Sequence, residues 1–184
     1  MRVGVFGGSF HPPHVGHALV AAWLRWTDQV DEVWLVPAWS HPFGKELAPF
    51  AHRLAWCRAL ADTVGPWVRV DPVERALGGT SYTIHTLDAL AEAHPHHGFR
   101  LVVGADVLPD TPRWRAWSRI EAEYAPLIVG RAGHAAVPGV PTFPEVSSTA
   151  VRAALARGED VSALVPRAVL AAIRASEAEG SGPS

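Results

Sequence analysis

The sequence has one cysteine, little net charge and no long apolar run, and each of these shortages excludes a class of protein. A single cysteine cannot form an intramolecular disulfide, a Cys-rich zinc site or a secreted disulfide scaffold. A net charge of −2 gives no overall electrostatic reason to bind nucleic acid or anionic lipid. No apolar run approaches the roughly 20 residues that span a bilayer. Because no basic-then-apolar leader follows Met1, we expect a cytoplasmic protein without nucleic-acid or membrane partners.

Composition and length predict one ordinary globular domain. Of the 184 residues, 48% are hydrophobic and 18% are charged, which excludes a disordered chain. The length is about that of a single domain. The last five residues, 180–184, are small and polar, so we expect a domain over 1–179 followed by a flexible tail.

Short apolar strands alternate with amphipathic helices along the whole chain. Continuous apolar strands separated by helices are typical of a parallel sheet that is covered on both faces. The predicted fold class is therefore α/β, a Rossmann-like doubly wound parallel sheet in a single domain, with ligands bound beyond the carboxyl ends of the strands. Strands are expected at Val3–Phe6, Val33–Val36, Trp67–Val70, Phe99–Val103 and Pro126–Val129, and helices at Gly16–Trp26, Phe50–Val64, Thr83–Ala93, Ser148–Arg157 and Pro166–Ala175.

The segment Gly7–His17 carries the strongest functional signal. Glycines after a buried strand let the backbone approach a phosphate closely, and two prolines hold the loop extended until a helix begins near Val15. The N-terminus of a helix favours an anion. His14 and His17 share one face of its first turn, where imidazoles can donate hydrogen bonds to phosphoryl oxygens. The alternative is a turn in which both histidines only cap or pack. Neither a Walker A loop nor a G-x-G-x-x-G loop is present.

Two further segments suit phosphate groups. Lys45 follows the second strand on a loop of prolines and glycine, where a mobile lysine can close over a triphosphate. Ser147 and Ser148 precede a helix with Arg152 in its first turn, which gathers hydroxyls, N–H groups and a guanidinium suited to β- and γ-phosphates. The alternatives are an exposed lysine, and an ordinary N-cap followed by a surface arginine.

Two positions after the fourth strand suit the other parts of a nucleotide. Asp106 closely follows Gly104 at the strand end, where an acidic residue can accept a hydrogen bond from a ribose hydroxyl or can cap a helix. Trp114 lies between Arg113 and Arg115 in a proline-bounded loop. A flat indole can stack on a pyridine ring, and nearby arginines suit a carboxylate; core packing is the alternative for Trp114.

These motifs together carry a family resemblance. A strand followed by GGSF-x-PPH-x-GH resembles the nucleotidyltransferase superfamily that is marked by (T/H)-x-G-H. More narrowly, the chain resembles the bacterial nicotinate-nucleotide adenylyltransferases. The narrower resemblance rests on Ser81–Leu87 (SYTIHTL), Gly104–Asp106 (GAD), Pro112–Trp114 (PRW) and Val146–Arg152 (VSSTAVR), which follow the family's order over nearly the whole chain.

The resemblance implies that the chain transfers the adenylyl group of ATP to nicotinate mononucleotide and releases pyrophosphate, with Mg²⁺ arriving with ATP. It implies catalytic roles for His14, His17, Lys45 and Arg152, ATP binding by Gly7, Gly8, Ser9, Phe10, Gly104, Asp106, Ser147 and Ser148, and mononucleotide binding by Thr83, Trp114 and Arg115. Ser148 and Arg152 would contact the leaving pyrophosphate. Trp114 would cover the nicotinate ring, while Thr83 and the backbone around Arg115 would hold its carboxylate. No residue is assigned as a metal ligand. The histidines at 94–97 could form a metal site, but we expect a solvated loop there because no acidic or cysteine residue is adjacent.

The chain departs from the family's usual text at three positions. His11 replaces an aspartate or asparagine, His85 replaces the aspartate of SYTI-D-TL, and Gly44 replaces a histidine beside Lys45. The remaining alternatives are a related nucleotidyltransferase that uses nicotinamide mononucleotide or phosphopantetheine, a non-catalytic nucleotide-binding protein, and a dinucleotide-binding dehydrogenase. The missing G-x-G-x-x-G after the first strand argues against the dehydrogenase. The sequence does not give the oligomeric state.

Overall fold

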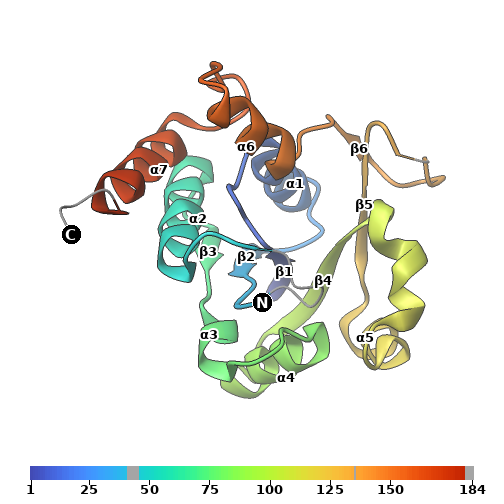
Figure 1. The fold of residues 1–184 in the computed structure, drawn as a ribbon. Helices are drawn as coiled ribbons and strands as arrows, with labels where there is room; N and C mark the ends of the chain where they lie inside the picture. Colours follow the sequence, from blue (N-terminus) through green and yellow to red (C-terminus); the bar gives the residue numbers. More distant parts are fainter. Residues whose placement is uncertain (41–45, 135, 181–184) are drawn as a thin grey trace.

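The strands form one six-stranded parallel sheet with the order β3-β2-β1-β4-β5-β6 (Figure 1). The computed structural model describes residues 1–40, 46–134 and 136–180. The chain starts in the middle of the sheet, builds outward to β3, then returns to the other side of β1 and builds outward again. This reversal is the topology of a doubly wound sheet, as predicted. The strands are β1 (Arg2–Gly8), β2 (Glu32–Pro37), β3 (Val68–Val70), β4 (Gly98–Gly104), β5 (Leu127–Arg131) and β6 (Thr142–Phe143).

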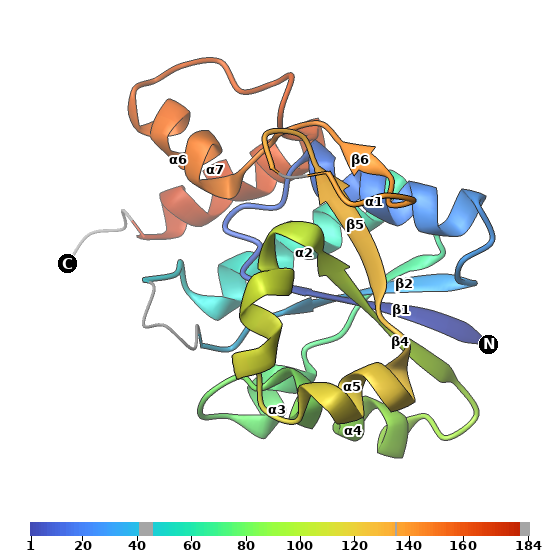
Figure 2. The same cartoon turned by 90° about the vertical axis from the view of Figure 1, so that its right-hand side faces the viewer.

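Helices cover both faces of the sheet. Figure 2 shows α1, α2, α6 and α7 on one side and α3, α4 and α5 on the other. The helices on the first side are α1 (Val15–Trp26), α2 (Phe50–Val64), α6 (Ser148–Ala156) and α7 (Arg167–Gly180). Those on the second are α3 (Val73–Leu77), α4 (Thr83–Ala93) and α5 (Trp117–Tyr124), with the 3₁₀ helix η1 (Ala105–Arg113) following β4. No helix in the described part of the chain is long and apolar enough to cross a membrane.

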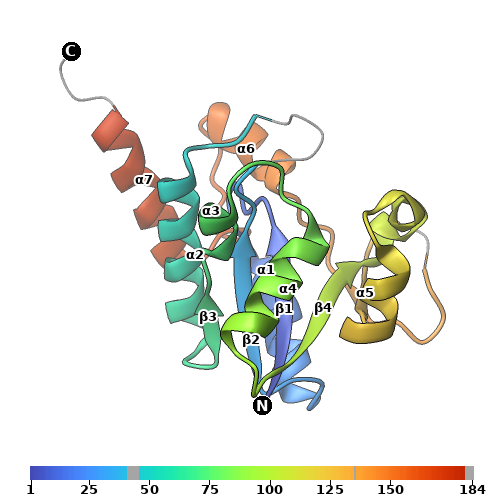
Figure 3. The ribbon, with the colours of Figure 1, turned by 90° about the horizontal axis from the view of Figure 1, so that it is seen from below.

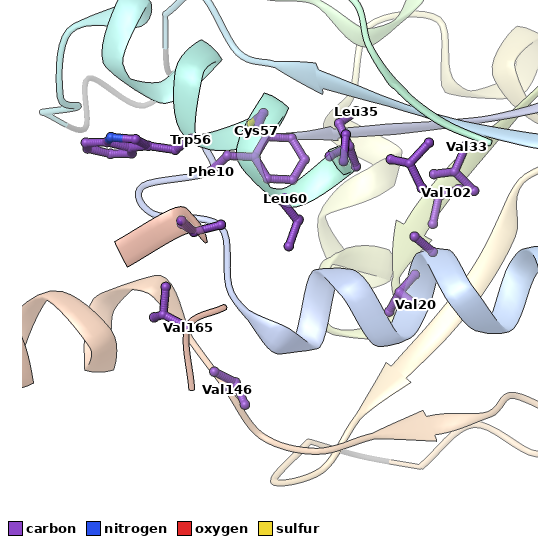
Figure 4. Packing of buried hydrophobic residues seen from close by; sticks show 14 of the residues in the cluster. Phe10, Val20, Val33, Leu35, Trp56, Cys57, Leu60, Val102, Val146 and Val165 are labelled. Atoms are coloured by element: carbon purple, nitrogen blue, oxygen red, sulfur yellow. The ribbon is translucent and has the colours of Figure 1, made fainter. Parts of the chain in front are cut away.

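Successive residues of the central strands face opposite sides and feed two separate cores. In β2, Val33 and Leu35 pack with α1 and α2, whereas Trp34 and Val36 pack with α4. Figure 4 shows the first core, in which Phe10 lies among Cys57 and Leu60 of α2. Because both faces of each strand are buried, the strands are continuously apolar, which is the pattern that predicted them.

The sequence predicts every long element, and the structure adds four short ones: α3, η1, α5 and β6. The 3₁₀ helix contains Pro109 and Pro112, so its sequence favours a loop, and the strand β6 has only two residues between prolines. A hydrophobic period cannot be read from segments this short. Trp114 consequently follows a 3₁₀ helix directly and lies in the short segment that joins η1 to α5.

The carboxyl ends of β1 and β4 lie next to each other at the point where the strand order reverses. Figure 3 shows the strands running from the edge near the N-terminus toward the edge where α6 lies. The loops that follow Gly8 of β1 and Gly104 of β4 leave the sheet at that far edge. This is the position at which doubly wound folds bind ligands.

Candidate active site

The loop between β1 and α1 is anchored from below by two buried side chains. Phe10 is only 1% exposed and has a φ of 43°, so its ring fills the core while the backbone turns back over the sheet. Arg53 of α2, also 1% exposed, donates from Nη1 to the backbone oxygen of Ser9 at 3.0 Å. The backbone around the candidate ATP-binding residues is therefore fixed before a ligand arrives.

His14 and His17 form a pair of neighbouring imidazoles at the N-terminus of α1. Their ring centroids are 3.9 Å apart, and Nδ1 of His17 accepts a hydrogen bond from the backbone N–H of His14 at 3.1 Å. The neutral ring of His17 must then carry its proton on Nε2, because Nδ1 acts as the acceptor. Phe10 supports the same ring, with centroids 4.9 Å apart. The pair presents a fixed N–H donor at the start of a helix, where the helix dipole favours an anion.

Burial keeps both imidazoles neutral in the free protein. Desolvation, with a smaller contribution from the positive charge of Arg131, lowers the pKa of His14 to about 4. Desolvation also lowers the pKa of His17 well below its ordinary value, and the neighbouring His14 adds to the effect. Nδ1 of His14 is buried and has no hydrogen-bond partner in the described structure. A bound anion would oppose both causes, so we expect these rings to bind a proton more readily when phosphate is present.

Gly16 is required by the position of His14. A Cβ atom on residue 16 would lie 3.0 Å from Nδ1 and 3.1 Å from Cε1 of His14. Contacts this short force one of the two groups to move. The glycine between the two histidines therefore makes room for the first imidazole.

The N-terminus of α6 is tied directly to the loop after β1. Ser147 caps α6 through its Oγ, which accepts from the N–H of Ala150 at 3.1 Å. The Oγ of Ser148 donates to the oxygen of Pro12 at 2.9 Å, and Nη1 of Arg152 donates to the oxygen of His11 at 2.6 Å. The structure thus brings two of the predicted phosphate-binding residues, Ser148 and Arg152, into contact with the loop that leads to the histidines. His11 and Arg152 also line a cleft of about 480 Å³ between α2, α6 and α7.

Asp106 pairs with an arginine that sequence reasoning missed. Its Oδ2 accepts from Nη2 of Arg131 at 2.8 Å, and the same nitrogen lies 2.9 Å from Nε2 of His134. Gly104 makes room for the Asp106 side chain, because a Cβ atom on residue 104 would overlap Oδ1 of Asp106. Arg131 is the last residue of β5, so a charged residue at the end of an apolar strand was the available signal.

The predicted mononucleotide residues come from two segments that meet at Tyr82. Thr83 is the first residue of α4, and Tyr82 is its N-cap. The guanidinium of Arg115 lies 5.1 Å from the centre of the Tyr82 ring, so the Ser81–Leu87 and Pro112–Arg115 segments are neighbours. Trp114 is half-buried, packs edge-to-face on Trp117 at 5.7 Å, and joins the second core. Part of the Trp114 ring therefore packs in the core, which was the alternative to stacking on a pyridine ring.

The remaining positions named from the sequence are Lys45 and the three that depart from the family's usual text. Lys45 and Gly44 lie outside the described residues. His11 stacks on Trp56 with ring centroids 6.1 Å apart, whereas His85 is exposed and its ring lies 5.5 Å from that of Tyr82. Within residues 1–40, 46–134 and 136–180, no group of three or more His, Cys, Asp or Glu side chains could hold a metal ion.

Comparison with known proteins gives a consistent family. A family model described as cytidylyltransferase-like matches residues 5–154. A protein of Anaeromyxobacter dehalogenans (strain 2CP-C), named "Probable nicotinate-nucleotide adenylyltransferase", is 49% identical over 177 residues, which cover 95% of this chain and 94% of that protein. One of the same name from Myxococcus xanthus (strain DK1622) is 42% identical over 175 residues, covering 95% and 92%. This chain belongs to the nicotinate-nucleotide adenylyltransferase family. The family that the sequence motifs suggested is thereby confirmed, and the chain is a nucleotidyltransferase.

Two solved structures share the fold of this nicotinate-nucleotide adenylyltransferase family member. Plasmodium falciparum nicotinic acid mononucleotide adenylyltransferase complexed with NaAD superposes with a TM-score of 0.80 at 19% identity, covering 95% of each chain. The same enzyme complexed with APC gives a TM-score of 0.77 at 18% identity, covering 96% of each chain. The single-domain parallel α/β fold predicted from the sequence is confirmed.

Proposed function

We propose that this chain transfers the adenylyl group of ATP to nicotinate mononucleotide, giving nicotinate adenine dinucleotide and pyrophosphate. The observation that carries the proposal is the pair His14 and His17 at the start of α1, placed beside the N-terminus of α6 in a chain of this family. Two helix starts, two imidazoles and Arg152 gather at one loop. Such a site suits the polyphosphate of a nucleotide.

The reaction is an in-line displacement at the α-phosphorus. A phosphate oxygen of the mononucleotide attacks, the α–β bridging bond breaks, and pyrophosphate leaves with the bonding electron pair. The attacking phosphate is already an anion, so no general base is required. Catalysis then consists of positioning and of stabilising negative charge on the equatorial and leaving oxygens.

The described residues divide these tasks by position. His17 has its Nδ1 occupied by the backbone of His14, so its Nε2–H is the donor that it can offer to a phosphoryl oxygen. We assign Arg152 and Ser148 to the leaving pyrophosphate, since both already contact the loop that would hold it. Lys45 is proposed to add a further charge to the triphosphate. Asp106, oriented by Arg131, would accept a hydrogen bond from a ribose hydroxyl.

The acceptor would bind at the junction of α4 and the segment after η1. Thr83 and the backbone near Arg115 would hold the nicotinate carboxylate, and Trp114 would stack on the ring. A site that hydrogen-bonds a carboxylate discriminates against an analogue that lacks it, because its donors are then left unpaired. The preference for the acid over nicotinamide mononucleotide is part of this proposal.

We further propose that Mg²⁺ enters with ATP and that the reaction takes place in the cytoplasm, where ATP is available. Mg²⁺ favours phosphate oxygens and water over an all-protein cage. The donor set here fits this, because the phosphate-facing candidates are histidines, hydroxyls and an arginine, and Asp106 is paired with Arg131. When bound, Mg²⁺ would neutralise part of the triphosphate charge.

One assay tests the proposed reaction. The protein is incubated with ATP, Mg²⁺ and, separately, nicotinate mononucleotide, nicotinamide mononucleotide or phosphopantetheine, and pyrophosphate is measured. We expect rapid release with nicotinate mononucleotide and much slower release with the other two. Faster release with another acceptor would reassign the substrate, and no release with any of them would favour a non-catalytic nucleotide-binding protein.

A further inference from the structure

Glu74 is a buried carboxylate that the proposed reaction does not use. It is the second residue of the short helix α3 and is only 8% exposed. Each of its oxygens accepts one hydrogen bond: Oε2 from the backbone N–H of Trp39 at 2.9 Å, and Oε1 from the hydroxyl of Thr86 at 2.9 Å. A carboxylate is costly to bury, so one that is retained with both oxygens occupied is expected to fix the groups that it binds.

The two partners of Glu74 belong to the chain that leaves β2 and to the start of α4, and the start of α4 also carries Thr83 of the proposed mononucleotide site. Trp39 lies two residues beyond the end of β2. Thr86 lies in the first turn of α4, three residues after Thr83. The helix α3, which carries Glu74, lies beside α4 (Figure 3). A second tie joins the same segments, because the N–H of Ser40 donates to Oγ of Ser81 at 3.2 Å. Glu74 thus holds the start of α4 to the chain that leaves β2.

Arg53 of α2 is a second buried charged residue, and it supports the loop that carries the candidate ATP-binding residues. Its Nη1 donates to the oxygen of Ser9 at 3.0 Å and its Nε donates to the oxygen of Ala48 at 2.9 Å. The ring of Phe50 lies 5.4 Å from this guanidinium and 5.2 Å from the ring of Trp39. Two buried side chains of opposite charge therefore support the proposed site. Arg53 binds the loop between β1 and α1, here called the phosphate loop, and Glu74 binds the start of α4.

We propose that Glu74 is a positioning residue for the nicotinate mononucleotide, which it serves by fixing the start of α4 against the segment after β2. It does not contact the reacting atoms. The inference rests on the proposed function, because it assumes that the mononucleotide binds near Thr83. Arg53 positions the phosphate loop instead, so disturbing the two residues should affect different substrates.

The substitution Glu74→Gln isolates this role. Glutamine has almost the same shape, but its NH₂ group cannot accept the hydrogen bond that one of the two donors offers. A charge-assisted bond lost from one wall of the site should raise the KM for nicotinate mononucleotide about tenfold, with kcat at saturation and the KM for ATP changed less than about twofold. The expected pattern for Arg53→Met is the reverse, with the KM for ATP raised.

The experiment measures both KM values and kcat for the wild type, Glu74→Gln, Thr86→Val and Arg53→Met, with thermal unfolding to establish that each is folded. Thr86→Val removes only one donor to Glu74, so it keeps the proposal testable if Glu74→Gln does not fold. Glu121→Gln, at an exposed position, is the matched control and should behave as the wild type.

Three outcomes are distinguishable. A selective rise in the KM for the mononucleotide in Glu74→Gln and Thr86→Val supports the positioning role. Equal rises for both substrates, or unchanged KM values in folded variants, would overturn it. If the wild type itself releases no pyrophosphate with nicotinate mononucleotide, the proposed function fails first, before any variant is compared.

Discussion

Nδ1 of His17 accepts a hydrogen bond from the backbone N–H of His14 at 3.1 Å, which joins the two histidines of the motif by a bond that needs no ligand. The bond fixes both the tautomer and the orientation of the second imidazole. It also occupies one of the N–H groups at the start of α1 that would otherwise be unpaired. The remaining free donor of His17 is therefore defined before any nucleotide binds.

His17→Ala tests that donor. Removing one preorganised donor to developing negative charge typically costs 10²–10³ in rate, so we expect kcat to fall by about that factor while the protein stays folded. Pyrophosphate release under saturating substrates measures the change, and circular dichroism checks the fold. His96→Ala, at an exposed position away from the loop, serves as the control. Near-normal turnover in His17→Ala would remove His17 from the mechanism.

Gly16→Ala tests the close approach of His14. The added methyl group would lie 3.0 Å from Nδ1 of that ring, so the imidazole must shift. We expect kcat to fall by about 10², because small misplacements of catalytic groups cost about that much. Gly98→Ala is a suitable control, since a Cβ there meets no atom within 4 Å. Equal kinetics for the two alanine variants would show that the position of His14 does not matter.

Stability should depend on pH through His14. Its pKa is about 4 in the folded protein against an ordinary 6.5, so between these values the unfolded chain binds more protons. Above pH 6.5 His14 is neutral in both states, so the free energy of unfolding has its full value. As the pH falls from 6.5 toward 4, protonation of His14 in the unfolded chain lowers the free energy of unfolding. One pKa unit corresponds to about 1.4 kcal/mol, so up to about 3 kcal/mol is involved.

Urea unfolding at pH 7 and pH 4.5 measures this effect. His14→Gln should lose less stability on acidification than the wild type. Part of the loss that the variant retains comes from His17, whose pKa is also lowered. His96→Gln should match the wild type. An identical loss in His14→Gln and the wild type would contradict the assignment to His14.

Trp114→Ala separates ring stacking from core packing. If the indole stacks on nicotinate, the KM for nicotinate mononucleotide should rise at least about fivefold, because stacking on an aromatic contributes on the order of 1 kcal/mol beyond burial. Trp114→Phe should recover most of the affinity. Trp26, which is 78% exposed, provides the control variant Trp26→Ala. A fall in melting temperature with an unchanged KM would assign Trp114 to packing alone.

The sequence was sufficient for the fold because the buried strands are continuously apolar runs and the amphipathic helices have a hydrophobic period that can be read. For α2 and α4 even the predicted bounds, Phe50–Val64 and Thr83–Ala93, match the structure. The helix α5 was missed, since it is only eight residues long and the residues on either side of it, Ala116 and Ala125, have left-handed backbone angles. Such short elements are set by tertiary packing, not by local pattern.

The site was predictable where a motif is contiguous and was missed where it is assembled in space. His14 and His17 share one helical turn, so their proximity follows from their spacing. Arg131 comes to Asp106 across two neighbouring strands, and Glu74 meets Trp39 from 35 residues away. Sequence reasoning had no pattern with which to pair these groups.

The bonds from Ser148 to Pro12 and from Arg152 to His11 join residues separated by 136 and 141 positions. The N–H of Val15, at the start of α1, likewise donates to the oxygen of Leu164 at 2.9 Å. During synthesis on the ribosome, the first loop to emerge has Arg53 of α2 early, but it waits for most of the polypeptide before these three bonds can form. A nascent chain that has not yet released α6 from the exit tunnel should be unable to hold ATP, however well its sheet has formed.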